Sequence, residues 1–262
     1  MHKWNPEEYA KHSSAQLAWA RELIARLKLG GDETVLDIGS GDGKVTAEIA
    51  ASVPHGRVVG IDGSPEMVKF AHAHFDDQRF PNLEFACMDA RRIELNRCFD
   101  IVFSNATLHW IEDHPAVLKG LSRVMRRGGR LIISCGGRGN AVEILEAVGV
   151  VTAKEHWRKY FQRFAFPYHF YGPEEYSRWL PEAGLSSRRV ELVPKNMTHP
   201  GAEGLAAWIR TTWLPFTERV PESAREGMIQ EVVKTYLDRF PVDAAGDACV
   251  KMVRLEVEAM KP

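Results

Sequence analysis

The sequence predicts an α/β fold in which a doubly wound, mostly parallel sheet carries helices on both faces. Between residues 33 and 137, five short β-branched runs alternate with helical patterns: TVLDIG, RVVGID, LEFACMD, FDIVFSN and GRLIISCG. Repeated strand–helix units are typical of a parallel sheet that is covered on both sides. Ser64 followed by Pro65 predicts a helix start, and Gly128 with Gly129 predicts a stop between a helix and the fifth strand.

Beyond residue 137 the chain predicts two further strands and a group of helices. The run ELVPK predicts the sixth strand, and helices are predicted over 201–220 and 222–240. In the last run, apolar Val253, Leu255 and Val257 alternate with charged residues, which indicates a strand that buries one face. Such a strand fits an antiparallel position. We expect the helices between these strands to cap the carboxyl ends of the sheet, where open α/β sheets bind ligands.

An aromatic segment follows the predicted core. Ten aromatic residues fall within 23 positions: Trp157, Tyr160, Phe161, Phe164, Phe166, Tyr168, Phe170, Tyr171, Tyr176 and Trp179. They form either a satellite core or the wall of an apolar pocket, and some residues can do both.

Composition indicates a globular protein with a small-molecule partner. The 262 residues are 45% hydrophobic and 26% charged, which argues against a disordered, collagenous or coiled-coil chain. With 34 Lys and Arg against 35 Asp and Glu, the net charge of −1 provides no electrostatic footprint for nucleic acid or an anionic membrane. Four well-separated cysteines, and the absence of a signal-like or membrane-spanning apolar run, predict a reduced, cytoplasmic protein.

The run VLDIGSGDGKV carries the densest chemical signal. Asp37 ends a strand, and Gly39, Gly41 and Gly43 follow at alternate positions before a helix. Glycines here allow a tight turn and the close approach of a ligand. The nicotinamide fingerprint requires a small residue at the position that Lys44 occupies, so the pattern disfavours a dehydrogenase.

Two further carboxylates follow strand ends. Asp62 lies 19 residues after Gly43 and is suited to bind both ribose hydroxyls of a nucleoside. Asp89 ends the third strand and is suited to bind an adenine amino group, with Ala90 beside the ring. A helix cap is the alternative role for each carboxylate, but three at successive strand ends favour a cofactor site.

With these residues the chain resembles the class I S-adenosylmethionine-dependent methyltransferases, whose acidic-G-x-G-x-G motif matches Asp37 to Gly43. The resemblance implies a Rossmann-like, seven-stranded sheet with an antiparallel last strand, and S-adenosylmethionine as cofactor. The implied cofactor contacts are Asp37, Gly39, Ser40, Gly41, Asp62, Gly63, Met67, Asp89, Ala90 and Asn105.

Within this class the chain is most similar to trans-aconitate methyltransferases and related small-molecule carboxyl methyltransferases. The matching segments are WNPEEY, GIDGSPEMV, DIVFSNATLHWIEDH and AAWIRTTWL. In such enzymes the amino-terminal segment folds over the cofactor, which implies contacts from Trp4, Tyr9 and Gln16. Alternatively, Trp4 and Tyr9 only fasten the first helix to the body. The aromatic segment differs from this group, because it is less polar than a tricarboxylate pocket.

We expect one methyltransferase domain over residues 1–262. Its expected parts are an amino-terminal helical lid (1–30), a cofactor-binding core (31–137), an aromatic-rich segment with helices (138–185), and the last strands (186–262) with inserted cap helices (201–240).

The leading hypothesis is O-methylation of a carboxylate, which is already ionised at neutral pH and needs no general base. The alternatives are methylation of a nitrogen, carbon or hydroxyl of a more apolar molecule, or a cofactor-binding protein without catalysis. His109 either acts as a base, holds the acceptor, or is a packed structural residue. Trp110, Tyr168, His169 and Tyr171 are candidate acceptor contacts.

Arg210 on the predicted cap helix over 201–220 is a candidate carboxylate clamp, with a surface or structural role as the alternative. His109 and His114 are five residues apart, not the four that would align two metal ligands on a helix, so we expect no metal. The sequence is compatible with a monomer and with a dimer.

Overall fold

The computed structural model describes residues 14–76 and 78–262 of the chain. It contains a seven-stranded sheet in the order β3-β2-β1-β4-β5-β7-β6, in which only β7 runs antiparallel to its neighbours. The strands are β1 (Thr34–Ile38), β2 (Arg57–Asp62), β3 (Leu83–Cys87), β4 (Phe99–Asn105), β5 (Met125–Gly136), β6 (Ser186–His199) and β7 (Ala248–Met260). The predicted doubly wound, mostly parallel sheet with an antiparallel last strand is confirmed.

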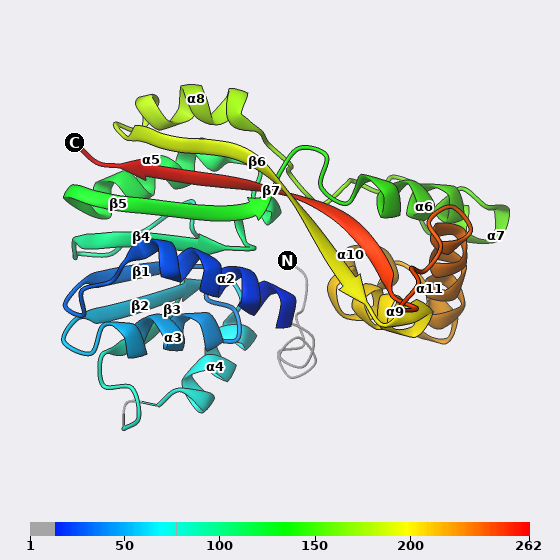
Figure 1. The fold of residues 1–262 in the computed structure, drawn as a ribbon, viewed down its shortest axis with the longest axis horizontal. Coiled ribbons are helices and arrows are strands. Elements are labelled where there is room, and N and C mark those ends of the chain that lie inside the picture. The colour runs from blue at the N-terminus through cyan, green and yellow to red at the C-terminus, as the bar shows by residue number, and fades with distance from the viewer. Residues whose placement is uncertain (1–13, 77) are drawn as a thin grey trace.

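Helices cover both faces of the sheet (Figure 1). One face packs against α2 (Ser14–Leu27), α3 (Lys44–Ser52) and α4 (Pro65–His74), and the other against α5 (His114–Val124) and α8 (Pro173–Glu182). A short 3-10 helix, η1 (Leu108–Trp110), follows β4. The strand residues alternate between these two layers, so that both faces of the sheet are buried.

A helical lobe lies beyond the carboxyl ends of the parallel strands, and the long strands β6 and β7 connect it to the sheet (Figure 1). The lobe consists of α6 (Val142–Thr152), α7 (Glu155–Arg158), α9 (Gly201–Thr212), α10 (Leu214–Thr217) and α11 (Glu222–Leu237). These helices share one apolar core, which contains Trp208, Trp213 and Tyr236. The expected cap over the carboxyl ends is therefore present, and it draws helices from both sides of β6.

The aromatic segment takes both of the roles considered for it. Tyr176 is fully buried in the core between the sheet and α8, and Trp157 is buried in the core of the lobe. Tyr168 and Phe170 instead line a cavity that is described below.

Local signals predicted some element ends well and others poorly. Ser64 caps α4 by accepting a hydrogen bond from the Met67 amide at 3.3 Å. The predicted stop at Gly128 and Gly129 is wrong, because α5 ends at Val124 and the glycine pair lies inside β5, where the pairing with β4 shifts register. The extra residues there form a bulge that glycine tolerates.

The last strand also departs from its pattern. β7 buries both faces around Arg254 and Glu256, each only 4% exposed. The helix α2 causes this burial, because its Trp19 lies against the Arg254 guanidinium and its Arg26 pairs with Glu256. In β7, charged residues thus alternate with apolar ones although the strand is covered on both sides. The expectation that this strand has one solvated face is therefore wrong.

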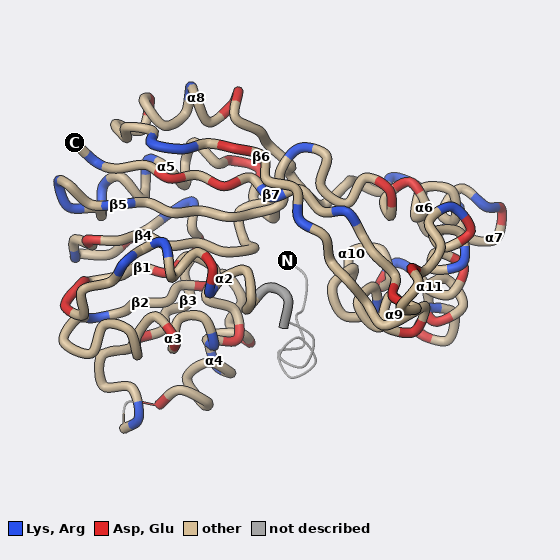
Figure 2. Tube along the Cα trace, in the orientation of Figure 1, with Lys and Arg blue, Asp and Glu red and all other residues tan. Residues whose placement is uncertain are grey.

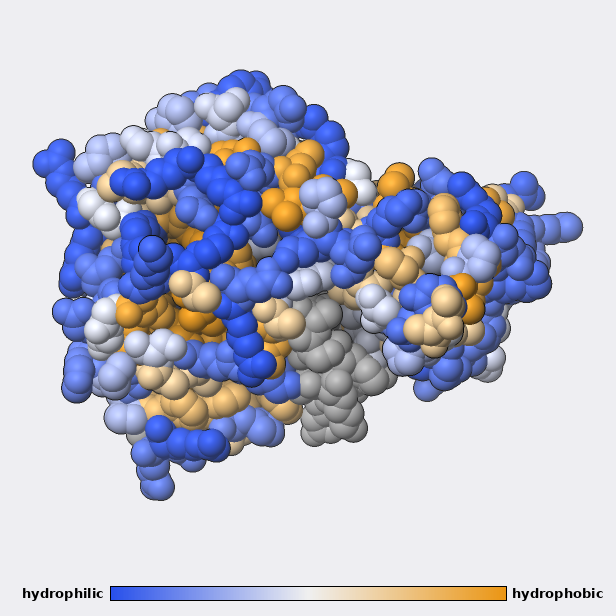
Figure 3. Space-filling view, viewed as in Figure 1, coloured by the Kyte–Doolittle hydropathy of each residue, from blue (hydrophilic) through white to orange (hydrophobic). Residues whose placement is uncertain are grey.

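Charges of both signs are interspersed over the sheet-containing body and the lobe (Figure 2). The visible face is largely hydrophilic, with hydrophobic patches over the middle of the body (Figure 3). Within the described residues, no helix is long and apolar enough to cross a membrane.

Candidate active site

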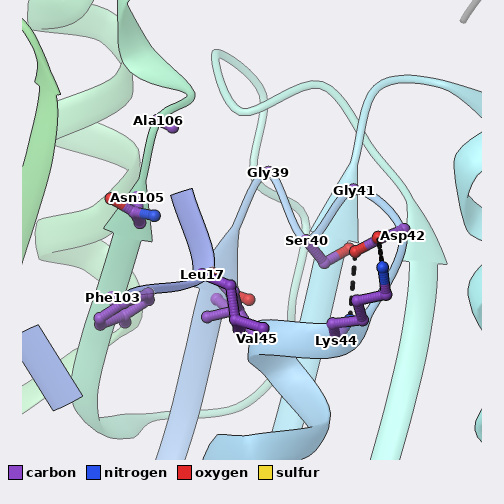
Figure 4. A pocket seen from close by; sticks show the side chains of 11 residues that line it. Leu17, Gly39, Ser40, Gly41, Asp42, Lys44, Val45, Phe103, Asn105 and Ala106 are labelled. Carbon is purple, nitrogen blue, oxygen red and sulfur yellow. Dashed lines mark hydrogen bonds and ion pairs between the residues drawn. The ribbon is translucent and has the colours of Figure 1, made fainter. Parts of the chain in front are cut away.

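Two cavities adjoin the loop between β1 and α3. A strand-end cavity of about 450 Å³ lies beside the carboxyl ends of β2 and β3 and the segment after β4. A smaller glycine-loop cavity of about 40 Å³ lies on the other side of the loop, where Leu17 of α2 and Val45 of α3 meet Phe103 and Asn105 of β4 (Figure 4). Between β1 and β4 the chain changes its direction of progress across the sheet, which is where such folds bind ligands.

The three glycines of the loop all adopt the left-handed region, with φ of 76°, 53° and 84° at Gly39, Gly41 and Gly43. A Cβ at Gly39 would lie 2.0 Å from Thr107 Oγ1, and one at Gly43 would lie 2.9 Å from Ala71. A Cβ at Gly41 would meet no protein atom within 4 Å, although Gly41 lines both cavities. Packing therefore requires the first and third glycines, whereas the second one faces ligand space.

Asp37 anchors this loop from the end of β1. Its carboxylate is 2% exposed and accepts a hydrogen bond from Thr46 Oγ1 of α3 at 2.7 Å. Burial, and to a lesser degree the charge of Asp62, raises the pKa of Asp37 to about 7. The side chain holds the glycine loop against the helix and also lines the glycine-loop cavity.

Asp62 connects the glycine loop with the next turn. One carboxylate oxygen accepts from the Gly41 amide at 2.9 Å, and the other accepts from the Ser64 amide at 2.8 Å. Burial raises the pKa of this carboxyl group, and the two amide donors act in the opposite direction. The carboxylate lines the strand-end cavity with lone pairs left for a further donor.

Asp89 also lines the strand-end cavity and is held by Arg91. The Arg91 guanidinium donates to both carboxylate oxygens, with distances from 2.6 to 3.0 Å. These bonds lower the pKa of Asp89. Arg91 was not among the predicted site residues; because both residues line the cavity, Arg91 fixes the orientation in which Asp89 presents its oxygens.

The residues around the two cavities fit S-adenosylmethionine. The strand-end cavity has the size of a nucleoside site. In the glycine-loop cavity, the hydroxyl of Ser40 is buried and has no hydrogen-bond partner within the described residues. Every predicted cofactor residue whose side-chain surroundings are described lines at least one cavity: Asp37, Gly39, Ser40, Gly41, Asp62, Gly63, Met67, Asp89, Ala90 and Asn105.

A third space, the aromatic cavity, lies between the sheet and the lobe and has a volume of about 100 Å³. Six aromatic side chains line it: Trp19, Trp110, Tyr168, Phe170, Trp208 and Trp213. The other lining residues include His109, Met197, Met252 and Arg254. The described part of its wall is mostly apolar, with one guanidinium and a few neutral polar groups.

Arg254 is the charged residue of this cavity that sequence reasoning missed. Its guanidinium donates to the Ser134 carbonyl at 2.7 Å and to Asn105 Oδ1 at 3.2 Å. In the sequence, Arg254 stands in an alternating pattern that indicates a solvated face. In the fold the side chain is buried, and the ring of Trp19 packs over it with its centroid 5.2 Å from the guanidinium carbon.

The structure brings together some of the predicted acceptor residues and not others. His109 and Tyr168 line the aromatic cavity, Trp110 lines both this cavity and the strand-end cavity, and His169 lines the strand-end cavity. Tyr171 lies elsewhere, and its hydroxyl donates to the Glu112 carbonyl at 2.9 Å.

Arg210 is not in the aromatic cavity either. On α9 it forms a two-pronged pair with Glu226 of α11, at 2.9 and 3.0 Å. Trp4 and Tyr9 lie outside the described residues, and so does the side chain of Gln16. Their predicted cofactor contacts stay predictions.

Comparisons with known proteins agree with this geometry. A family model described as a methyltransferase domain matches residues 29–184. Trans-aconitate 2-methyltransferase of Deinococcus radiodurans is 33% identical over 225 residues, which cover 83% of each chain. An uncharacterized methyltransferase of Schizosaccharomyces pombe is 33% identical over 198 residues, which cover 73% of this chain and 74% of the relative.

A solved structure has the same fold. Coclaurine N-methyltransferase bound to N-methylheliamine and S-adenosylhomocysteine superimposes with a TM-score of 0.62 at 14% identity, over 94% of this chain and 73% of the other. The family model spans more than half of the chain, and a relative of one-third identity spans most of it. The chain therefore belongs to the class I S-adenosylmethionine-dependent methyltransferases, and S-adenosylmethionine is its cofactor.

Proposed function

We propose that this enzyme methylates the carboxylate oxygen of a small organic acid with a largely apolar body. The observation that carries the proposal is the position of Ala106, which lines the strand-end cavity, the glycine-loop cavity and the aromatic cavity. A methyl donor in the first two spaces and an acceptor in the third would meet at this residue.

The backbone at Ala106 supports such a junction. Ala106 has a φ of 58°, a left-handed conformation that residues with a side chain rarely adopt. Its amide donates to the Ser134 carbonyl of β5 at 2.7 Å, which fixes the turn. Strained backbone of this kind is concentrated at functional sites.

The charge and shape of the aromatic cavity favour an acid with one carboxylate. Arg254 provides positive charge in the wall of the cavity, and the surrounding rings provide apolar contact. The related trans-aconitate 2-methyltransferases are named for a tricarboxylic acid. Three carboxylates would need more cationic partners than the single guanidinium among the described lining residues.

When bound, S-adenosylmethionine supplies a sulfonium methyl group, and transfer to a carboxylate gives a methyl ester and a neutral thioether. The protein's own contribution is alignment, because holding two reactants in line contributes roughly 7–11 kcal/mol to the lowering of the barrier. Asp62 and Asp89 would orient the nucleoside, whereas Arg254 and the aromatic wall would orient the acid. The enclosing rings would exclude water from the reacting atoms.

The test is an acceptor screen on the full chain with S-adenosylmethionine, scored by S-adenosylhomocysteine release and by mass spectrometry of the product. The screen pairs aryl- and alkyl-carboxylic acids with the alcohol and the amine of the same body, and includes trans-aconitate. We expect methyl esters from the apolar monocarboxylic acids. Preferred methylation of the amines or alcohols would refute the carboxylate assignment, and preferred methylation of trans-aconitate would refute the apolar body.

A further inference from the structure

The hydrogen bonds of His109 define which of its nitrogens carries the proton. The backbone amide of Gly136, at the end of β5, donates to His109 Nδ1 at 3.3 Å. Because a backbone amide has no lone pair to offer in return, Nδ1 is the acceptor, and the neutral ring carries its proton on Nε2. The backbone of His109 is fixed as well, since its carbonyl accepts from the His169 amide at 2.8 Å.

The groups around His109 keep it uncharged. Burial, followed by the positive charge of Arg254 and by His114, lowers the pKa of His109 to about 3. Burial also lowers the pKa of His114 to about 4, raises that of Cys135 to about 11, and raises that of Tyr168 above its usual value. At neutral pH the ring therefore faces one fixed cation and three uncharged groups.

Among the described residues, the wall of the aromatic cavity thus presents hydrogen-bond donors and no base. Within the described residues, neither His109 Nε2 nor the Tyr168 hydroxyl has a hydrogen-bond partner, and the two rings lie 6.0 Å apart. Among the described residues that line this cavity there is no carboxylate, and His109 is the one imidazole. The lone pair of that imidazole is already occupied by Gly136.

We infer that His109 is a fixed hydrogen-bond donor to the acceptor oxygen, not a general base, and that this site methylates only oxygens that are ionised before they bind. The inference rests on the proposed function, because it assigns a role within the acceptor site. The inference decides which acceptors can react. A carboxylate gains the methyl group without losing a proton, whereas an alcohol must lose one, and none of the described residues that line the cavity is available to take it.

The protonation state of His109 can be measured without knowing the acceptor. Full-length protein labelled with ¹⁵N at its ten histidines, with S-adenosylhomocysteine added, would be followed by long-range ¹H–¹⁵N spectra from pH 5 to 9. The His109 signals are assigned by their loss in His109→Gln. We expect a neutral ring protonated on Nε2 throughout this range. A ring protonated on Nδ1, or one that becomes an imidazolium above pH 5, would overturn the inference.

Kinetics with an acid that the screen identifies provide the second readout. We expect kcat/KM to stay constant from pH 6 to 9, and His109→Phe to raise KM about tenfold, whereas His109→Gln, which retains a donor near Nε2, recovers most of the loss. The exposed His55→Gln is the matched control. If kcat/KM of the wild type falls tenfold per pH unit below pH 7 and that of His109→Gln does not, His109 acts as a base and the inference is wrong. If no acid reacts, the proposed function fails, while the spectra still decide the state of His109.

Discussion

The guanidinium of Arg254 donates to Asn105 Oδ1 at 3.2 Å, which joins the last strand of the chain to the end of β4. Asn105 lines the glycine-loop cavity and Arg254 lines the aromatic cavity. The two residues are 149 positions apart in the sequence. This bond therefore links the wall of the glycine-loop cavity to the wall of the aromatic cavity, the proposed acceptor site, which thus depends on the long-range pairing of β7 with β5.

Replacing Arg254 by Met should separate acceptor binding from cofactor binding. The substitution removes the positive charge of the aromatic cavity while retaining much of the side-chain volume, so we expect KM for a carboxylic acid to rise at least tenfold. Affinity for S-adenosylhomocysteine, measured by calorimetry, should change less than threefold. The free energy of unfolding should fall by about 1–3 kcal/mol, because the buried Ser134 carbonyl loses its charged donor.

Arg210→Met is the matched control for this experiment. It removes a guanidinium that pairs with Glu226 on the partly exposed surface between α9 and α11, where ion pairs contribute about 1 kcal/mol or less. Neither KM nor cofactor affinity should change measurably. A rise in KM for Arg210→Met combined with normal kinetics of Arg254→Met would show that the clamp predicted from the sequence is correct after all.

Replacing Asp62 by Ala should weaken cofactor binding. The variant loses a carboxylate that faces the strand-end cavity and also releases the Gly41 and Ser64 amides. Hydrogen bonds to charged groups contribute about 1.5–3 kcal/mol, which corresponds to roughly a tenfold to 150-fold loss of S-adenosylhomocysteine affinity in a calorimetric titration.

Two further variants separate ligand contacts from loop geometry at this position. Asp62→Asn retains an oxygen for one amide and should bind with intermediate affinity. Asp238→Asn, an exposed substitution after α11, should bind normally. Unchanged affinity of Asp62→Ala would exclude this carboxylate from the cofactor site.

Replacing Tyr176 by Phe should destabilise the protein through His114. The buried Tyr176 hydroxyl donates to His114 Nδ1 at 2.7 Å, and His114 Nε2 in turn donates to the Leu108 carbonyl at 2.8 Å. The pair holds η1, which carries His109 and Trp110. Loss of the hydroxyl leaves a buried nitrogen without a partner, so the free energy of unfolding in urea should fall by about 1–3 kcal/mol.

The control for Tyr176→Phe is Tyr160→Phe in the lobe. The Tyr160 hydroxyl has no hydrogen-bond partner among the described residues, so this variant should unfold at nearly the wild-type urea concentration. Equal stability of the two variants would mean that the His114 contact contributes little.

The sequence allowed the cofactor side of the site to be predicted because its signals are local. A strand end, a glycine loop and a helix start are encoded within a few residues, so Asp37, Gly41 and Asp62 could be assigned to one edge of the sheet. Their convergence then follows from parallel pairing alone, because the carboxyl ends of parallel strands meet at the same edge.

The charged residue of the aromatic cavity, which is the proposed acceptor site, could not be predicted in the same way. Arg254 lies inside because α2 covers β7, and Arg210 lies outside because Glu226 of α11 faces α9. The positions of both side chains depend on contacts between segments that are distant in the sequence. The helical and alternating patterns are local and do not predict such contacts. The pattern indicated which residues are charged, but not which helix would cover them.

Stability at acid pH should depend on His199. Its ring is 8% exposed, stacks on Trp208 at 4.9 Å between centroids, and has a buried Nε2 without a hydrogen-bond partner in the described residues. Burial lowers its pKa to about 4 in the folded protein. As the pH falls below 6.5, the unfolded chain therefore binds a proton that the folded protein does not. The folded state then loses about 1.4 kcal/mol per pH unit from this residue until the pH reaches about 4.

The variant His199→Phe tests this contribution, because it preserves the stacking and cannot titrate. Its free energy of unfolding should gain about 2 kcal/mol relative to the wild type between pH 7 and 5. The exposed His55→Phe should show no such gain. The other titrating groups are common to all three proteins, so they cancel in the comparison. If urea denaturation gives the same fall in the free energy of unfolding for His199→Phe and the wild type between pH 7 and 5, His199 is not the group responsible.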